Sequence, residues 1–217
     1  MRVVMMGPPG AGKGTQSIRL AAQFGVVHVS TGDMFRAAVS SGSEIGRRAT
    51  SFMDAGRLVP DEVTLGIVRE RLSEPDAKAG FILDGFPRTV AQGEGLTQIL
   101  KDRGAELDAV VLIEVADDIL IQRAAGRVVC NRCGRVFHLE YNPPTGPSGG
   151  CACGGTVARR ADDSTETVRA RLAVYRAQTE PLKSYYASRG LLVAVDGRGG
   201  VDDVYDRIVK AFGRCMK

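Results

Sequence analysis

The stretch Gly7-Pro8-Pro9-Gly10-Ala11-Gly12-Lys13-Gly14-Thr15, close to the start of the chain, decides the fold. Read from Gly7, it matches the phosphate-loop pattern G-x-x-x-x-G-K, and Gly14 stands before Thr15. The apolar run Arg2–Met6 precedes it and a helical pattern follows, which is the strand–loop–helix setting that the motif requires. Backbone N–H groups of such a loop, together with the helix N-terminus, hold a polyphosphate. The alternative is a glycine-rich turn that binds nothing, and the agreement of position, flanks and residue types disfavours it.

The composition bounds the class of protein. A chain of 217 residues suffices for one α/β domain with inserted subdomains, and 44% hydrophobic and 25% charged residues are ordinary for a globular protein. The net charge of +4 suits a phosphate-rich ligand but is too mild and dispersed to indicate a nucleic-acid partner. No apolar run approaches the roughly 18 residues of a membrane span, and the first one ends in Gly-Pro-Pro, so it is no signal peptide. We therefore expect a cytoplasmic protein without a membrane partner.

Short β-rich runs alternate with longer amphipathic stretches. The expected strands are Val3–Met6, Val26–Val29, Gly80–Asp84, Ala109–Val115 and Leu191–Asp196. The expected helices are Lys13–Phe24, Gly32–Ser41, Ser43–Ala55, Asp61–Leu72, Thr89–Arg103, Asp117–Ala125, Ser164–Ser188 and Val201–Phe212. This alternation after a phosphate loop predicts an α/β, three-layer fold with a parallel five-stranded sheet. Ligands of such sheets bind beyond the carboxyl ends of the strands.

Two segments interrupt the alternation. The first, from about Ser30 to Val59, contains only short helices. The second, from about Gly126 to Asp163, carries four of the five cysteines and is too long for an ordinary connection. Long functional loops are often lids. An odd total of five cysteines, with four of them gathered in one segment, indicates metal binding rather than a disulfide framework.

Charged side chains near predicted element ends form the candidate site. Arginine suits phosphate because its planar fork bonds two oxygens at once, although for any single arginine a solvated surface is the better interpretation. Asp84 ends a buried strand beside the phosphate loop, where its carboxylate can hold the water shell of Mg²⁺. The alternative is a structural aspartate that caps a turn. The arginines in question are Arg36, Arg88, Arg123, Arg127, Arg160 and Arg171.

At these residues the chain resembles the adenylate kinases of the nucleoside monophosphate kinase family, which interconvert ATP plus AMP with two ADP. The resemblance covers essentially the whole chain, and its motifs occur in the family's order. They are the phosphate loop, STGDMFR (30–36), GRLVPDE (56–62), DGFPRT (84–89) and the run Asp162–Leu172. The resemblance implies a core of residues 1–29, 60–125 and 164–217, an AMP-binding subdomain of residues 30–59 and a lid of residues 126–163.

The resemblance also implies roles for individual residues. The ATP site would comprise Gly10, Ala11, Gly12, Lys13, Gly14, Thr15, Arg123, Arg127, Val136, Phe137 and Gly199. The AMP site would comprise Thr31, Arg36, Arg57, Leu58, Val59, Gly85, Phe86, Pro87, Arg88, Gln92, Arg160 and Arg171. The catalytic residues would be Lys13, Arg88, Arg123, Arg160 and Arg171. Gln92 can offer the adenine edge both an acceptor and a donor, whereas without the family it is equally well a polar helix residue.

The expected mechanism follows from charge. The attacking AMP oxygen is already ionised at neutral pH, so no general base is needed, and catalysis consists of positioning and neutralising two polyanions. A lid must exclude water.

One position departs from the family, which usually has two arginines after the glycine at Gly126. Here Arg127 is followed by Val128, and Arg159 is the candidate substitute.

The cysteines indicate a structural zinc site. Cys130 and Cys133 form a C-x-x-C pair, and Cys151 and Cys153 follow as a C-x-C pair, which is the two-plus-two pattern of tetrahedral zinc. Relatives with a long lid usually have C-x-x-C or C-x-x-D as the second pair, so Cys151 lies one residue from the expected third ligand. A metal-free lid and a disulfide remain alternatives. His138 is a possible substitute ligand, but we interpret it as structural.

Other functions fit parts of the pattern. A UMP/CMP kinase is disfavoured by the long lid, Thr31 and Gln92, whereas a GTP-using AMP kinase stays open because backbone atoms partly read the donor base. A phosphate-loop ATPase or switch would not need arginines apart from the loop. A zinc-ribbon nucleic-acid binder would need a stronger basic and aromatic surface. The expected partners are therefore ATP and AMP, bound by a monomer, with Mg²⁺ and zinc as cofactors and no nucleic acid.

Overall fold

A computed structural model describes residues 1–160 and 163–215, the last two without their side chains. Its strands are β1 (Arg2–Met6), β2 (Val27–Ser30), β3 (Phe81–Asp84), β4 (Ala109–Glu114), β5 (Arg127–Cys130), β6 (Val136–His138), β7 (Val157–Ala158) and β8 (Leu192–Asp196). Its α-helices are α1 (Lys13–Phe24), α2 (Thr31–Ser40), α3 (Glu44–Asp54), α4 (Asp61–Ser73), α5 (Val90–Lys101), α6 (Asp117–Ala125), α7 (Thr165–Val174), α8 (Leu182–Ala187) and α9 (Val201–Cys215). Short 3₁₀ turns are η1 (Pro75–Ala79) and η2 (Pro147–Gly149).

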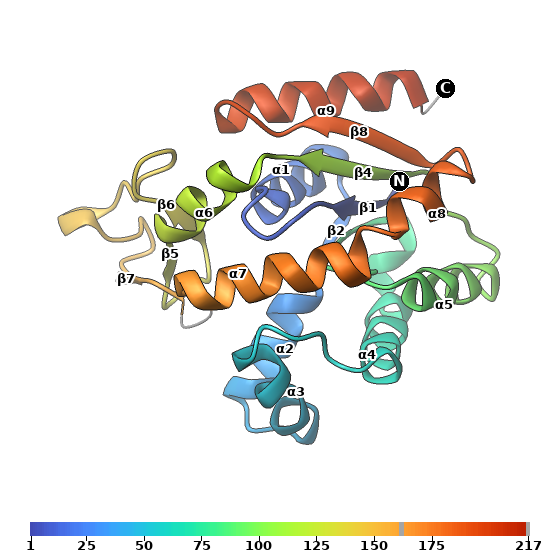
Figure 1. The fold of residues 1–217 in the computed structure, drawn as a ribbon, viewed down its shortest axis with the longest axis horizontal. Coiled ribbons are helices and arrows are strands. Elements are labelled where there is room, and N and C mark those ends of the chain that lie inside the picture. The colour runs from blue at the N-terminus through green and yellow to red at the C-terminus, as the bar shows by residue number, and fades with distance from the viewer. Residues whose placement is uncertain (161–162, 216–217) are drawn as a thin grey trace.

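The predicted five-stranded sheet is confirmed, with strand order β2-β3-β1-β4-β8 and parallel pairing throughout (Figure 1). β1 lies in the middle, where Arg2 pairs with Phe81 of β3 and Val3 pairs with Ala109 of β4. The carboxyl ends of β1 and β3 therefore lie next to each other. This places the phosphate loop, which follows β1, beside Asp84, which ends β3.

Both faces of the sheet are covered, as the continuous apolar strands predict. Alternate residues of β1 serve opposite sides: Val3 and Met5 pack with α1, α6, α7 and α9, whereas Val4 and Met6 pack with α4, α5 and α8. This alternation follows from the two-residue period of a strand. The two apolar layers hold the central strand rigidly, and with it the loop that follows.

Two smaller apolar clusters lie outside the sheet. One joins α2, α3 and the start of α4 around Phe35, Ala49 and Val59. The other lies in the segment after α6 and contains Val128 and Phe137. In Figure 1 the two segments extend away from the sheet in different directions, with α2 and α3 at the bottom and β5, β6 and β7 at the left.

The second segment has a sheet that the sequence did not predict. β6, β5 and β7 form an antiparallel three-stranded sheet in that order. Strands of two to four residues with cysteines and few aromatic side chains give little periodic signal. Within this sheet Val128 pairs with Phe137 and is only 5% exposed, so it contributes to the small core.

The predicted single helix Ser164–Ser188 is wrong, because it is divided. α7 ends at Val174, a π-helical turn η4 (Tyr175–Thr179) follows, and α8 begins at Leu182. Pro181 lacks a backbone N–H group and cannot continue the helical hydrogen bonds, which accounts for the interruption. Asp162, in the last of the family-like motifs, lies outside the described residues.

Among the described residues, no helix combines the length and apolar character needed to cross a lipid bilayer.

Candidate active site

The phosphate loop forms a cradle at the end of β1. Gly7, Gly10 and Gly12 all have positive φ angles, of 146°, 85° and 92°. A Cβ atom at Gly7 would lie 2.7 Å from the carbonyl oxygen of Ile113, so only glycine fits there. The Lys13 ammonium group folds back over the loop and donates hydrogen bonds to the carbonyl oxygens of Gly7 and Pro8, at 2.9 and 3.0 Å.

The pKa of Lys13 is unusually low for a lysine. Burial lowers its pKa from 10.5 to about 8, and the positive charges of Arg88, Arg171 and Arg127 act in the same direction, while Asp84 opposes them. The lysine therefore lies buried beside other cations, where its charged form is disfavoured. An anion such as a phosphate would favour that charged form.

Asp84 lies next to this lysine, as the sheet order requires. Burial acts to raise its pKa, but the neighbouring His28 and the charges of Lys13 and Arg88 outweigh burial and hold the pKa below the usual value. Its Oδ2 atom is 3.7 Å from Nε2 of His28 and 3.1 Å from the point where a Cβ of Gly14 would lie. An ionised carboxylate this close to the phosphate loop has the chemistry that Mg²⁺ and its bound waters require.

Two clefts open around these groups. The larger cleft contains most of the expected ATP-site residues and several of the expected arginines. Among its lining residues are Gly10, Ala11, Gly12, Lys13, Gly14, Thr15, Asp84, Arg123, Arg127, Val136, Phe137, Arg160 and Gly199.

The smaller cleft lies between α2, α3 and α5. Among its lining residues are Thr31, Phe35, Met53, Arg57, Leu58, Val59, Thr64 and Gln92. One group of residues lines both clefts and so marks where they meet: Gly32, Arg36, Gly85, Arg88 and Arg171. Three arginines at this junction can neutralise negative charge arriving from either side.

Hydrogen bonds hold several of the arginines in position. Arg88 donates from Nε to the carbonyl oxygen of Gly85 at 2.7 Å. Arg123 donates to the carbonyl oxygens of Gly197 and Gly199, at 2.9 and 3.3 Å. These hydrogen bonds hold both guanidinium groups at the edge of the clefts, where an anion could reach them.

Arg127 is held differently, because it forms a two-point ion pair with Asp163, and Arg171 lies 3.9 Å from the same carboxylate. Asp163 thus joins the segment after α6 to the start of α7. An entering polyphosphate would compete with this carboxylate for both arginines.

Two expected AMP-site residues lie away from both clefts. Phe86 is 1% exposed and packs in the core with α4, α5 and α8, because it follows the buried strand β3 and continues its apolar face. Pro87 lines a third, smaller cavity with Leu58, Arg88 and Arg171.

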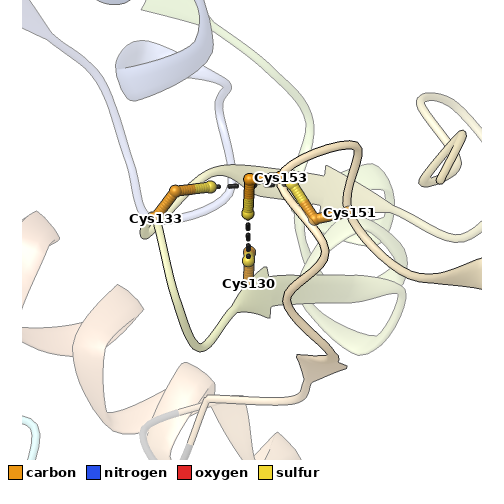
Figure 2. A group of neighbouring side chains, drawn as sticks. All are labelled: Cys130, Cys133, Cys151 and Cys153. Carbon is orange, nitrogen blue, oxygen red and sulfur yellow. Dashed lines mark hydrogen bonds between the residues drawn. The ribbon is translucent and has the colours of Figure 1, made fainter.

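The four cysteines gather at one point of the segment after α6, whose three-stranded sheet β6-β5-β7 is called the lid sheet from here on, as Figure 2 shows. Their sulfur atoms all lie within 4.8 Å of one another, with Cys130 and Cys153 at 3.5 Å and Cys133 and Cys151 at 3.6 Å. All four are free thiols, so the disulfide alternative is not observed. Four sulfurs around tetrahedral zinc at about 2.3 Å would be spaced similarly, so the cluster fits a metal ion of this kind.

Comparisons with known proteins agree with this geometry. The family model described as adenylate kinase matches residues 5–191. Adenylate kinases of Streptomyces griseus and Moorella thermoacetica are each 52% identical, the first over 97% of both chains and the second over 99% of both. That of Bacillus pumilus is 51% identical over the full length of both chains.

The chain belongs to the adenylate kinase family.

Within this adenylate kinase fold, two expectations receive a structural answer. Val128 faces the core of the lid sheet and does not line either cleft. Arg159 is exposed and does not line either cleft, so the structure does not support Arg159 as the substitute arginine. His138 lies outside the cysteine cluster, and its Nδ1 atom accepts hydrogen bonds from the backbone N–H groups of Glu140 and Tyr141.

Sequence reasoning missed several residues at or beside the clefts, and four of them matter for the argument. His28 and Tyr141 line the larger cleft, Asp163 pairs with Arg127, and Asp61 binds the side chain of Gln92. Asp61 and Asp163 each lie at or just before a helix start, where an acidic residue is ordinarily explained by the helix dipole. Only their pairing with Gln92 and Arg127 in the structure distinguishes these two aspartates from ordinary acidic residues at helix starts.

Proposed function

We propose that this chain transfers the terminal phosphoryl group of MgATP to AMP, reversibly, to give two ADP. The proposal rests on one observation, which is that the two clefts meet at Arg36, Arg88 and Arg171. A protein that merely binds or hydrolyses one nucleotide has no use for a second cleft joined to the first by arginines. A transferase needs one, because donor and acceptor phosphates must face each other in line.

The larger cleft suits ATP and the smaller suits AMP. The phosphate loop and Lys13 would bind the ATP phosphates, with Val136, Phe137 and the backbone at Gly199 beside the base and ribose. In the smaller cleft, Arg36 and Arg88 would bind the AMP phosphate and Gln92 would contact adenine. Thr31 supports this cleft by donating to the carbonyl oxygen of Gly85 at 2.9 Å.

The chemistry requires charge neutralisation and no proton transfer to the enzyme. The AMP oxygen attacks the γ-phosphorus, the bond from that phosphorus to the β-bridging oxygen breaks, and ADP leaves. Lys13 and the arginines at the junction would stabilise the charge that spreads over the transferred group. Asp84 would hold Mg²⁺ through water, and the ion would neutralise phosphate charge when bound.

The segment of residues 126–163 would act as a lid over the ATP cleft, residues 30–59 would act as the AMP subdomain, and the remainder would form the core. Closure would exclude water and so prevent hydrolysis of the γ-phosphate.

The four cysteines would hold structural zinc. Because four thiolates complete its coordination, the ion would fix the lid loops and take no part in the reaction.

Phosphoryl transfer with defined nucleotide pairs tests the proposal. The protein is mixed with Mg²⁺ and ATP or GTP as donor, and with AMP, UMP or CMP as acceptor, and diphosphate formation is followed. We expect ATP with AMP to be the best pair. Diphosphate formation that does not depend on the added monophosphate would show a hydrolase and contradict the proposal, and faster transfer to UMP or CMP would reassign the acceptor.

We also propose that the protein acts as a cytoplasmic monomer without nucleic-acid or membrane partners. Both clefts are built from residues of one chain, so no second copy is needed to complete the site. Light scattering at working concentration, with and without nucleotides, tests the monomer. A mass near twice 23.1 kDa would contradict it.

A further inference from the structure

The side chain of Gln92 is fixed from both ends. It is 2% exposed and lines the smaller cleft. Its Nε2 atom donates a hydrogen bond to Oδ1 of Asp61 at 2.7 Å, and its Oε1 atom accepts one from the backbone N–H of Arg88 at 2.8 Å.

These two partners allow one orientation of the amide. An ionised carboxylate can only accept hydrogen bonds, and a backbone N–H group can only donate. If the amide turned over, Oε1 would face the Asp61 carboxylate and Nε2 would face the Arg88 N–H group. Both contacts would then be repulsive, in a place where water scarcely reaches the side chain to compensate.

The Asp61 carboxylate is itself held. Its second oxygen, Oδ2, accepts a hydrogen bond from Oγ1 of Thr89 at 2.9 Å. Thr89 in turn caps α5 by accepting from the backbone N–H of Gln92 at 3.1 Å. The first residue of α4 is thus joined to the first turn of α5.

We propose that Asp61 is a positioning residue that makes the acceptor site specific for adenine by fixing the orientation of the Gln92 amide. This inference rests on the proposed function, in which Gln92 meets the acceptor base. After its two protein contacts, the amide retains one hydrogen on Nε2 and one acceptor direction on Oε1. Those remaining groups complement adenine, whose edge presents a donor at N6 and an acceptor at N1.

The opposite pattern belongs to hypoxanthine and guanine, which present an acceptor at O6 and a donor at N1. The Gln92 amide could pair with it only after turning over, and Asp61 opposes that turn. A site built around fixed polar groups discriminates strongly against a ligand with mismatched groups, because buried donors and acceptors are left unpaired. Asp61 therefore controls the choice of base although it does not line the cleft.

A purely structural role for Asp61 is the competing explanation. An acidic residue in the first turn of α4 stabilises the helix, and the bond to Thr89 joins two helices. Loss of either effect would lower stability and weaken all acceptors alike. Discrimination between AMP and IMP would not change, because these nucleotides differ only at the two positions that the amide reads.

The test compares kcat/KM for AMP and for IMP, with ATP as donor, in four proteins. Asp61→Asn removes one of the two contacts that oppose a reversed Gln92, because the new amide can donate to Oε1 while the Arg88 N–H group stays in place. The AMP-to-IMP ratio should therefore fall about tenfold or more relative to wild type. Glu62→Gln removes an exposed charge from the same turn, and Thr89→Val breaks the link between the helices but keeps the carboxylate. In both of these variants the ratio should stay within about twofold of wild type. Thermal unfolding of each protein shows whether it is folded.

An unchanged ratio in folded Asp61→Asn, or an equal fall in Thr89→Val, overturns the inference. A wild-type protein that transfers to neither nucleotide overturns the proposed function instead.

A second experiment needs no variant. It uses purine riboside 5′-monophosphate, which retains N1 but has no group at position 6. We expect wild type to prefer AMP, then this analogue, then IMP. If IMP is as good as the analogue, the amide turns freely and the inference is wrong.

Discussion

Arg88 contributes to the site through its backbone and through its side chain. The backbone N–H group binds Gln92 and the carbonyl oxygen accepts from Thr179 at 2.8 Å, while the guanidinium group lies where the two clefts meet. Arg88→Ala removes the guanidinium group with its aliphatic stem and leaves both backbone contacts in place. We expect kcat to fall about 10²–10³-fold, because removal of one hydrogen-bond donor that stabilises charge in the transition state has an effect of this size. The melting temperature should change little. Arg69→Ala, an exposed arginine of α4, is the control. Near-normal kcat and KM for AMP in Arg88→Ala would exclude this role.

Lys13 gives the site a dependence on pH. Its pKa of about 8 in the folded protein means that the ammonium group loses its proton above pH 8, so kcat/KM for MgATP should decline there. In the unfolded chain the proton stays until about pH 10.5, so the contribution of Lys13 to the free energy of unfolding should rise between about pH 8 and pH 10.5. Lys13→Arg stays charged and should lack the decline in its residual activity. A wild-type kcat/KM that is constant up to about pH 9.5 would contradict this interpretation.

The sequence predicted many of the residues that line the clefts. Glycines, a lysine and arginines that occur together in fixed motifs are seldom needed for the fold alone, so they indicate a binding site. It failed where a residue acts through another residue. Asp61 and Asp163 look like ordinary acidic residues near helix starts, and their partners Gln92 and Arg127 lie 31 and 36 positions away in the chain. Such distant pairs leave no local signal.

Among the helices, α2 and α3 pack closely enough to require a glycine. A Cβ atom at Gly46 of α3 would lie 2.1 Å from the carbonyl oxygen of Ala38 in α2. We expect Gly46→Ala to cost about 1–3 kcal/mol of stability. We also expect it to raise KM for AMP several-fold, since α2 carries Arg36.

The matched control for this prediction is Gly66→Ala. Gly66 is exposed within α4, and no atom lies within 4 Å of a Cβ there. This change should stabilise the protein by about 0.5–1 kcal/mol through helix propensity. Chemical denaturation and AMP kinetics measure both variants, and an equal response of the two would contradict the packing argument.

The lid sheet should depend on its metal. We expect about one equivalent of zinc in protein purified without chelator, and loss of that zinc in Cys133→Ser. Because the lid core contains few apolar residues, metal loss should lower the melting temperature and expose residues 126–160 to proteolysis. Cys215→Ser, which leaves the four clustered cysteines unchanged, should retain the zinc. Less than about half an equivalent in the wild-type protein would contradict the assignment.

The elements of the core were predictable and those of the lid were not. The buried parallel strands are continuous apolar runs, and the predicted boundaries of β1 to β4 and β8 differ from the observed ones by at most one residue at each end. The strands of the lid sheet are short and pack on a core of few apolar residues, so no periodicity marks them. The division of the helix before β8 at Pro181 was overlooked because apolar residues continue on both sides of it.

At the scale of the whole molecule, three parts converge on one site. The core supplies the phosphate loop and Asp84, the segment of α2 and α3 supplies Arg36, and the segment after α6 supplies Arg127. Closure of the outer segments should bring these charges onto the phosphates of both nucleotides. We expect ATP and AMP together to protect residues 126–160 from amide hydrogen exchange more than either nucleotide alone. Equal protection by ATP alone would mean that closure does not depend on the acceptor.

The most direct test of two facing nucleotide sites is a crystal structure with a mimic in which two adenosines are joined by a polyphosphate bridge. We expect one adenine beside Gln92 and the other beside Gly199. The bridge should lie between Lys13 and Arg88, covered by the cysteine-bearing lid. A structure with only one occupied cleft, and with the lid away from the bridge, would contradict this expectation.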